Sequence, residues 1–307
     1  MFSCQENYFW TCKTGTLEFI EDQTTLKPRL ATADYSFPLL RWHQSLRLAQ
    51  DLGFAGIDVS LFEGRSHLKP AETLTRPRQA GVEVRNAVHG TGLTVADVFG
   101  IPGVTFADLC PNHPDFAVRN QSREYFQKIL EFAVACESDH LSILPGIAFE
   151  NESFDQSLSR CAEELAWRCE RAADAKVKFS VEAHIGSIIQ KPEFAARLLA
   201  LVPALTLTLD LGHFVAQGIA QTGADALIAR ASHVHARCAS PNRLQTSLKH
   251  NTIDFADLVK KLTAQAYSGW YAVEYVWIDW EHCNEVDNLS ETILLRDLLQ
   301  SMGEQLA

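Results

Sequence analysis

The stretch "LTLTLDLGHF" (Leu205–Phe214) alternates leucine and threonine until it reaches Asp210, and His213 follows three residues later. This alternation of leucine with a β-branched residue predicts a strand. A buried strand that ends on a carboxylate and an imidazole is typical of a functional site, because buried carboxylates are costly unless they are paired or bound to metal. The simpler interpretation is that Asp210 caps a helix whose first turn carries His213. The rest of the chain decides between the two.

The same kind of strand recurs along the chain. Short β-rich runs are found at residues 29–36, 54–61, 93–100, 140–146, 177–184, 205–213, 232–238 and 269–277. Helical patterns lie between these runs, so the sequence predicts a parallel sheet. With eight strand–helix units, the closed (β/α)₈ or TIM barrel is the natural α/β arrangement. The alternative, an open doubly wound sheet, is expected to carry a glycine-rich phosphate-binding turn after an early strand. The nearest candidate, "GTGLTV" at Gly90, follows a predicted helix instead of a strand.

The chain divides into a short extension and one domain. Its 307 residues are 47% hydrophobic, which is enough to bury the core of one large barrel. Residues 1–28 show no clear periodicity, so we predict an N-terminal extension that packs loosely or is disordered, followed by the barrel over residues 29–307. The last helix is expected to open at Asn288, because Glu291 lies three residues further on, at the spacing of a capping box.

Composition narrows the classes of partner and compartment. The formal net charge of −11 disfavours nucleic acid and anionic membrane surfaces as partners. The eight cysteines include no C-x-x-C pair, and neither a signal peptide nor a membrane-spanning stretch is recognisable, which is consistent with the cytoplasm. We therefore expect a small-molecule ligand. A homo-oligomer is compatible with the sequence, which does not set the number of copies.

Four consecutive predicted strands carry carboxylates or imidazoles at their carboxyl ends, where TIM barrels build their active sites. In chain order these residues are Glu182 and His184, Asp210 and His213, His233 and His235, and Glu274. The mixed oxygen and nitrogen set suits Mn²⁺, Mg²⁺ or Co²⁺, and Zn²⁺ also remains compatible. Because His233 and His235 are two residues apart, they point the same way along their strand. One of them is expected to be a ligand and the other to support it or to lie in the core.

The motifs "VEAHIGS", "LDLGHF", "HVHAR" and "VEY", in this order, resemble those of the sugar phosphate isomerase/epimerase superfamily, the xylose isomerase-like TIM barrels. The resemblance covers residues 29–300. It implies one divalent metal ion, and it also implies that the two glutamates act as the acid/base pair and that His213 contacts substrate. The implied metal ligands are Glu182, Asp210, His235 and Glu274. We add His184 and Arg237 as substrate-binding residues, with Arg243 as the alternative arginine.

The resemblance implies a metal-dependent isomerase or epimerase that acts on a small ketose, a sugar acid or a related hydroxy-carbonyl compound through an enediolate. A dehydratase on the same metal site, or a non-catalytic metal-binding barrel, are the alternatives. The chain differs from ketose 3-epimerases by Ile188, where those enzymes carry a second glutamate. It also lacks the Asp-x-His of endonuclease IV, since Leu248 stands two residues before His250, so DNA repair is disfavoured.

The early strands offer four polar residues without a supporting motif: Asp58, Glu63, His67 and Asp97. They are candidates for shaping the substrate site from the loops that follow the first strands. The alternative is that they are surface polar residues, which is the usual place for such side chains.

Overall fold

A closed barrel of parallel strands forms the centre of the molecule. The structure is a computed structural model that describes residues 11–13, 16–18 and 28–305. The barrel strands are β3 (Arg29–Ala33), β4 (Gly56–Phe62), β5 (Thr94–Ile101), β6 (His140–Ile143), β7 (Lys178–Glu182), β8 (Thr206–Leu209), β9 (Ala231–Ala236) and β10 (Trp270–Val273). Each strand pairs with the next in sequence, and β10 returns to pair with β3. The TIM barrel fold and all eight predicted strands are thereby confirmed.

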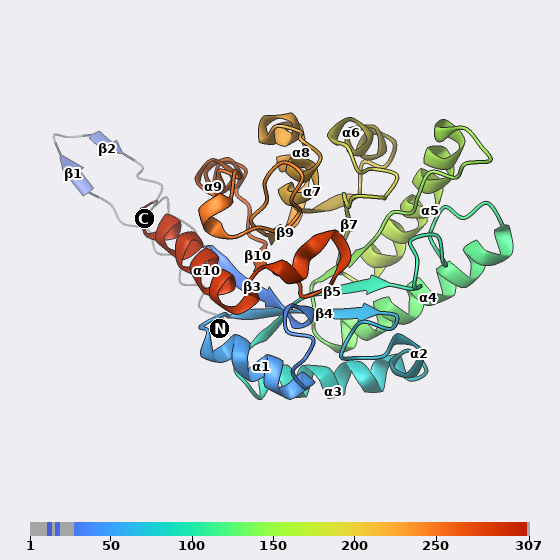
Figure 1. Cartoon of the computed structure of the whole chain (residues 1–307), viewed down its shortest axis with the longest axis horizontal. Helices are drawn as coiled ribbons and strands as arrows, with labels where there is room; N and C mark the ends of the chain where they lie inside the picture. The colour runs from blue at the N-terminus through green and yellow to red at the C-terminus, as the bar shows by residue number, and fades with distance from the viewer. Residues whose placement is uncertain (1–10, 14–15, 19–27, 306–307) are drawn as a thin grey trace.

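Helices surround the strands (Figure 1). They are α1 (Trp42–Asp51), α2 (Pro70–Thr73), α3 (Pro77–His89), α4 (Phe116–Ala135), α5 (Phe154–Asp174), α6 (Pro192–Leu201), α7 (Leu211–Ala216), α8 (Asp225–Ile228), α9 (Phe255–Ala264) and α10 (Asn288–Gln305). Short 3₁₀ helices lie between these elements: η1 (Asp34–Ser36), η2 (Gln221–Ala224), η3 (Leu248–His250) and η4 (Trp280–Glu285). The apolar core lies between this ring and the barrel, with Phe126, Ile129 and Leu141 fully buried.

The inside of the barrel is packed in layers. Near its amino-terminal end, Trp270 packs with small alanines, which leave room for the indole. Further up, the hydroxyls of Ser142, Ser180 and Thr208 contact one another at 2.6–3.1 Å. These buried hydroxyls are each other's hydrogen-bond partners, so the polar interior carries no cost of unsatisfied groups at this level. Polar layers continue from here to the carboxyl ends of the strands.

The helices differ from the prediction at two places. The helical pattern expected within residues 70–90 splits into α2 and α3, because Pro77 opens a new helix and disfavours a helical residue before it. A helix after β8, α7, was predicted only by the simpler interpretation of the opening motif, and the structure contains it.

The capping box predicted at Asn288 is wrong. The side chain of Asp287 accepts hydrogen bonds from the backbone N–H groups of Leu289 and Ser290, so Asp287 caps α10. Glu291 instead accepts a bond from the N–H of Leu248 at 2.7 Å. The buried Asn288 side chain donates to the carbonyl of Ser36 at 3.0 Å and ties α10 to the loop after β3. A tertiary contact therefore replaces the local one that the spacing favoured.

The N-terminal segment is described only in part. Strands β1 (Thr11–Lys13) and β2 (Thr16–Glu18) pair antiparallel. Residues 1–10, 14–15 and 19–27 lie outside the described residues, so the extension over 1–28 stays a prediction. Six cysteines of the barrel are buried free thiols, as expected of small apolar side chains: Cys110, Cys136, Cys161, Cys169, Cys238 and Cys283. No helix among the described residues is both long and apolar enough to cross a bilayer.

Candidate active site

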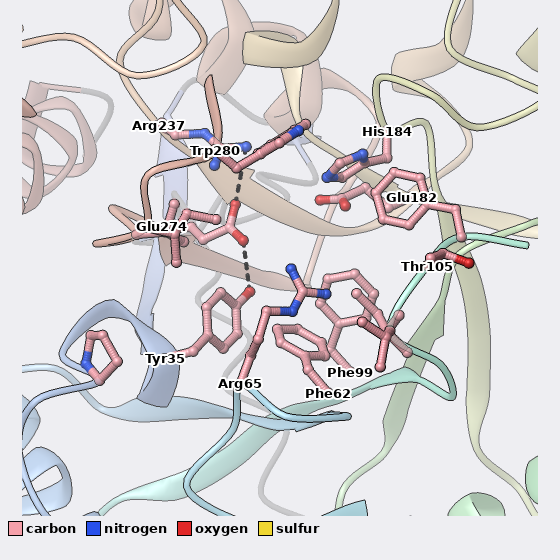
Figure 2. Close-up of a pocket in the computed structure, with 16 residues that line it drawn as sticks. Tyr35, Phe62, Arg65, Phe99, Thr105, Glu182, His184, Arg237, Glu274 and Trp280 are labelled. Atoms are coloured by element: carbon pink, nitrogen blue, oxygen red, sulfur yellow. Dashed lines mark hydrogen bonds and ion pairs between the residues drawn. The ribbon is translucent and has the colours of Figure 1, made fainter. Parts of the chain in front are cut away.

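A pocket of about 370 Å³ opens at the carboxyl ends of the strands (Figure 2). Its floor carries Glu182, His184, Arg237 and Glu274. Its walls are largely aromatic and aliphatic, formed by Tyr35, Pro38, Phe62, Phe99, Ile101, Val104, Phe106, Val276, Ile278 and Trp280. Arg65 and Thr105 complete the lining. Polar groups are thus concentrated on the floor, which is the arrangement of a small-molecule site with one reactive end.

Two glutamates and one histidine meet on the floor. Glu182 is the last residue of β7, and Glu274 follows β10 directly. Between them in the ring of strands, His235 of β9 places Nδ1 2.7 Å from Oε1 of Glu182 and 3.5 Å from Oε2 of Glu274. All three side chains are buried. The structure therefore brings three of the four predicted metal ligands together, and each offers a ligand atom within 4.8 Å of the other two.

Asp210 divides its two oxygens between two tasks. Its Oδ1 accepts a hydrogen bond from the N–H of Gly212 at 2.7 Å and so caps α7. Its Oδ2 accepts a hydrogen bond from Nη2 of Arg237. The capping interpretation of the opening motif is thus correct for one oxygen, while the other faces the site. Since Arg237 directly follows β9, this contact joins the ends of two neighbouring strands.

His213 lies on the first turn of α7, above the floor of the pocket. Its Nδ1 accepts a hydrogen bond from the N–H of Ile185 at 3.3 Å. Burial holds the pKa of His213 well below its usual value, so the ring is neutral. Nη2 of Arg237, which can only donate, lies 3.2 Å from Nε2 of His213. The same Nε2 lies 3.9 Å from Oε2 of Glu182 and 3.6 Å from Oδ2 of Asp210. Glu182, His184 and His213 also offer ligand atoms within 4.8 Å of one another. The contact of His213 with substrate stays a prediction.

His184 lies on the pocket floor beside His213, with the ring centroids 4.0 Å apart. Its Nδ1 lies 2.6 Å from the carbonyl oxygen of Ile185 and therefore donates to it, which leaves Nε2 as an acceptor. The ring is stacked on Trp280 with centroids 5.2 Å apart and packs edge-on against Phe106. Burial lowers the pKa of His184 to about 4. A neutral acceptor held between two aromatic rings fits the predicted contact with a substrate hydroxyl.

Tyr35 is a site residue that sequence reasoning missed. It lies in η1, directly after β3, and its hydroxyl donates a hydrogen bond to Oε1 of Glu274 at 2.7 Å (Figure 2). The only signal in the sequence is its place at the end of the first barrel strand. Because it follows a strand that carries no ligand motif, nothing in the sequence alone distinguishes it from a core tyrosine.

The two glutamates have different electrostatic surroundings. Burial raises the pKa of Glu182 to about 7. Burial alone would also raise the pKa of Glu274, but the charges of His235 and Arg237 overcome it and hold that pKa below its usual value. The hydrogen bond from Tyr35 acts in the same direction. Two carboxylates whose pKa values are pushed apart are typical of an acid/base pair.

A second buried cluster lies deeper in the barrel. Nε2 of His233 is 2.8 Å from Oδ2 of Asp58, and the same oxygen is 3.4 Å from Nε2 of His235. On the neighbouring strands, Nδ1 of His140 is 2.7 Å from Oδ1 of Asp97. Asp58 and Asp97 are fully buried, so the interpretation of these two as surface residues is wrong. They balance the histidines inside the barrel, and Asp58 supports His235 from the side opposite Glu182.

The remaining candidates lie outside the pocket. Glu63 does not line it, and the ring of His67 instead contacts Oγ of Ser45 and the carbonyl of Asp34 at 3.2 and 3.1 Å. Arg243 forms an ion pair with Glu285 at 2.7 Å, with both side chains half exposed. Of the two arginines considered for substrate binding, only Arg237 lines the pocket.

The donor set fits a divalent cation at three of the four predicted positions. Glu182, His235 and Glu274 offer two carboxylates and an imidazole, a set suited to Mn²⁺, Mg²⁺, Co²⁺ or Zn²⁺. Oε2 of Glu274 is buried and accepts no hydrogen bond from the residues that the structure describes. A carboxylate behind a ligating histidine, here Asp58, is the usual second layer of a metal site. Asp210, whose Oδ2 accepts a hydrogen bond from Arg237, is not part of this group of three.

Solved structures with the same fold belong to proteins of several activities. The L-ribulose 3-epimerase structure is 16% identical and has a TM-score of 0.71, and the match covers 91% of this chain and 95% of that one. A xylose isomerase-like TIM barrel protein from Mycobacterium smegmatis, in complex with magnesium, is 13% identical (TM-score 0.67; 92% and 98% covered). The probable 3-DHS dehydratase of petrobactin synthesis from Bacillus anthracis is 14% identical (TM-score 0.64; 87% and 98% covered). At these identities the likeness establishes the fold alone.

Sequence comparison assigns the chain to one protein family. No curated protein sequence matches the chain. A protein-family match extends over residues 46–297, from α1 to α10, and so includes seven of the eight barrel strands and every residue of the pocket floor. The chain therefore belongs to the xylose isomerase-like TIM barrel family.

Proposed function

We propose that this chain is a divalent-metal-dependent isomerase or epimerase that acts on a small ketose, sugar acid or related hydroxy-carbonyl compound through an enediolate. The observation that carries the proposal is the pair of buried glutamates, Glu182 and Glu274, on either side of His235 at the floor of a pocket. Proton abstraction next to a carbonyl needs a carboxylate within reach of the substrate and a second group that returns the proton.

The residues that would hold the ion are Glu182, His235 and Glu274, together with Asp210. When bound, a divalent ion polarises the substrate carbonyl and thereby acidifies the neighbouring C–H. All four side chains are buried, and Glu182 and Glu274 line the pocket, so the reacting carbons of a substrate would lie between the two glutamates.

Glu182 and Glu274 are the groups that transfer the proton in this proposal. One carboxylate takes the proton from the carbon next to the carbonyl, and the same or the opposite one returns it. Return to the neighbouring carbon gives isomerisation, and return to the other face of the original carbon gives epimerisation. Tyr35 keeps Glu274 in place through its 2.7 Å hydrogen bond. His213, whose Nε2 lies 3.2 Å from Nη2 of Arg237, is the further group expected to meet a substrate oxygen.

The walls bear on the identity of the substrate. Phe62, Phe99, Phe106 and Trp280 offer rings and no hydrogen-bonding carboxylates or amides, so they favour a compact molecule whose hydroxy-carbonyl end meets the floor. Arg65 reaches into the mouth above Phe62 (Figure 2), which favours an anionic or oxygen-rich far end. Sugar acids and short ketoses meet both conditions.

Deuterium exchange tests the proposal without knowledge of the product. Protein loaded with Mn²⁺ is incubated in D₂O with a panel of ketoses, sugar acids and α-hydroxyketones, and the substrate protons are followed by NMR after removal of the ion. We expect loss of the proton next to the carbonyl in at least one compound, and no loss with protein kept in chelator. If no compound exchanges although the protein holds metal, the proposal is wrong. Release of water from the exchanging compound would identify a dehydratase instead.

A further inference from the structure

The guanidinium of Arg237 lies among the groups that would bind the ion. Its Nη2 donates to Oδ2 of Asp210, lies 3.4 Å from Oε2 of Glu274 and is 3.2 Å from Nε2 of His213. The side chain is 3% exposed, so it is a buried cation. This single nitrogen atom thus contacts groups that follow two different strands, β8 and β10.

Charge explains why a cation is held there. Glu182, Asp210 and Glu274 place three carboxyl groups on one buried floor, and uncompensated buried charges are strongly unfavourable. Arg237 offers one positive charge to this cluster, whereas a divalent ion offers two. Either cation can neutralise the floor, but a guanidinium and a divalent ion this close to each other would repel strongly.

Asp210 makes the two cations compete for one atom. Its Oδ1 accepts a hydrogen bond from the N–H of Gly212 at 2.7 Å, and Oδ2 is the oxygen that faces the site. Arg237 already donates to Oδ2. An ion bound to Oδ2 would lie beside the nitrogen that donates to the same oxygen, and repulsion between the two cations favours displacement of the guanidinium from Asp210.

Arg237 is not locked in its position. The hydrogen bonds and ion pairs that the described residues give its guanidinium all run through Nη2, and its buried Nε has no partner among them. The side chain also lines the pocket, so the space beside it can receive the guanidinium. Figure 2 shows Arg237 at the edge of the floor, next to Trp280 and above Glu274.

We propose that Arg237 and a divalent ion are alternative cations of this site: Arg237 neutralises Asp210 until the ion binds, and then turns into the pocket, where it is free to hold an oxygen of the substrate. This inference rests on the proposed function, because it concerns the same metal site. It makes Arg237 a residue that lowers metal affinity and couples loading of the ion to the substrate pocket.

Metal affinity measured by calorimetry tests the inference without any substrate. Mn²⁺ is titrated into wild type, Arg237→Met and Arg243→Met, the last being a matched arginine in an exposed ion pair with Glu285. We expect Arg237→Met to bind Mn²⁺ at least about 10-fold more tightly than wild type, and Arg243→Met to match wild type. Equal or weaker binding by a folded Arg237→Met variant would overturn the inference and leave the proposed function standing.

The outcomes for the two proposals can be told apart. If no protein binds Mn²⁺, the metal-dependent function fails and the inference fails with it. If only Arg237→Met binds Mn²⁺, the competition is supported and the metal-dependent function of the wild type is wrong.

A second readout covers the case in which Arg237→Met does not fold. With [¹⁵N]arginine labelling, the Nε–H signal of Arg237 is the one that is missing from the spectrum of Arg237→Lys. Saturating Mg²⁺ should shift that signal in wild type. If that signal stays in place while calorimetry shows Mg²⁺ bound, Arg237 does not move and the inference is overturned.

Discussion

The hydroxyl of Tyr35 and Oε1 of Glu274 are joined by a hydrogen bond of 2.7 Å between residues 239 positions apart in the sequence. Tyr35 follows β3 and Glu274 follows β10, the two strands that close the barrel. The bond therefore holds Glu274, the second glutamate of the site, beside the pair of strands that closes the barrel. It also holds one oxygen of Glu274 in place and leaves Oε2 free for other partners.

Removing this hydroxyl should weaken proton transfer. Tyr35→Phe takes away a bond that stabilises the ionised carboxylate, so the pKa of Glu274 should rise. We expect proton exchange to slow by about 10-fold, the scale of one hydrogen bond to a charged group. The acid limb of the pH–rate profile should move to higher pH. Tyr125→Phe, whose hydroxyl contacts the carbonyl of Leu61, is the control and should leave both unchanged. An unshifted profile in Tyr35→Phe would count against this role.

Changing either glutamate to glutamine should separate metal binding from proton transfer. An amide oxygen can still bind an ion, but the amide is no base. Glu182→Gln and Glu274→Gln should each keep measurable Mn²⁺ and lose at least about 100-fold in the rate of exchange, the usual scale for general-base removal. NMR in D₂O gives the rate and elemental analysis gives the metal. Exchange that persists in both variants would mean that neither glutamate is the base.

His213 and Asp210 should respond differently to removal. Asp210 is one of the four implied metal ligands, whereas His213 is expected to contact substrate. His213→Ala should therefore lower turnover by about 10-fold, the cost of one or two hydrogen bonds, with metal content nearly intact. Asp210→Ala is the comparison and should lose most of the metal. Equal loss of metal from both variants would make His213 a ligand, and full metal content in Asp210→Ala would remove Asp210 from the ligand set.

Asp58 should influence the metal from inside the barrel. Its Oδ2 contacts Nε2 of both His233 and His235, so Asp58→Asn breaks a buried pair and should lower the free energy of unfolding by about 3 kcal/mol. Metal affinity should fall by about 10- to 100-fold, since the carboxylate orients His235. Asp97→Asn is the matched control, because Asp97 pairs with His140 instead. It should cost similar stability in urea unfolding but leave Mn²⁺ affinity unchanged; an equal loss of affinity would contradict the specific link through Asp58.

Asp34 should make stability depend on pH. Burial raises its pKa to about 7 in the folded protein, well above its value of 3.8 in an exposed chain. The folded state then binds the proton more tightly than the unfolded state, so stability is highest at low pH and declines as pH rises through 7. The slope is at most about 1.4 kcal/mol per pH unit. Asp34→Asn, neutral at every pH, should remove this slope from the thermal unfolding midpoint, while exposed Asp51→Asn should retain it. An unchanged slope in Asp34→Asn would refute the assignment.

Much of the site could be predicted because a parallel barrel has a simple rule. Each strand delivers its last residues to the same end, so the positions of Glu182, Asp210, His235 and Glu274 at strand ends already implied that they lie near one another. The alternation of His233 and His235 likewise predicted two imidazoles on one side of β9. Asp287 caps α10 in place of the predicted Asn288. The reason is that the side chains of Asn288 and Glu291 make tertiary contacts instead of the capping bonds.

The sequence by itself determined the barrel, the order of its strands and the residues at their ends, because these follow from periodicity along the chain. Only the tertiary structure decided which side chains meet: Tyr35 on Glu274 across the seam, Asp58 behind His235, and Arg237 on Asp210. These contacts depend on the direction of each side chain and on the spacing between neighbouring strands, and neither is encoded in a local pattern. For that reason one oxygen of Asp210 caps a helix as its sequence context suggests, while the other meets a cation that only the closed barrel brings to it.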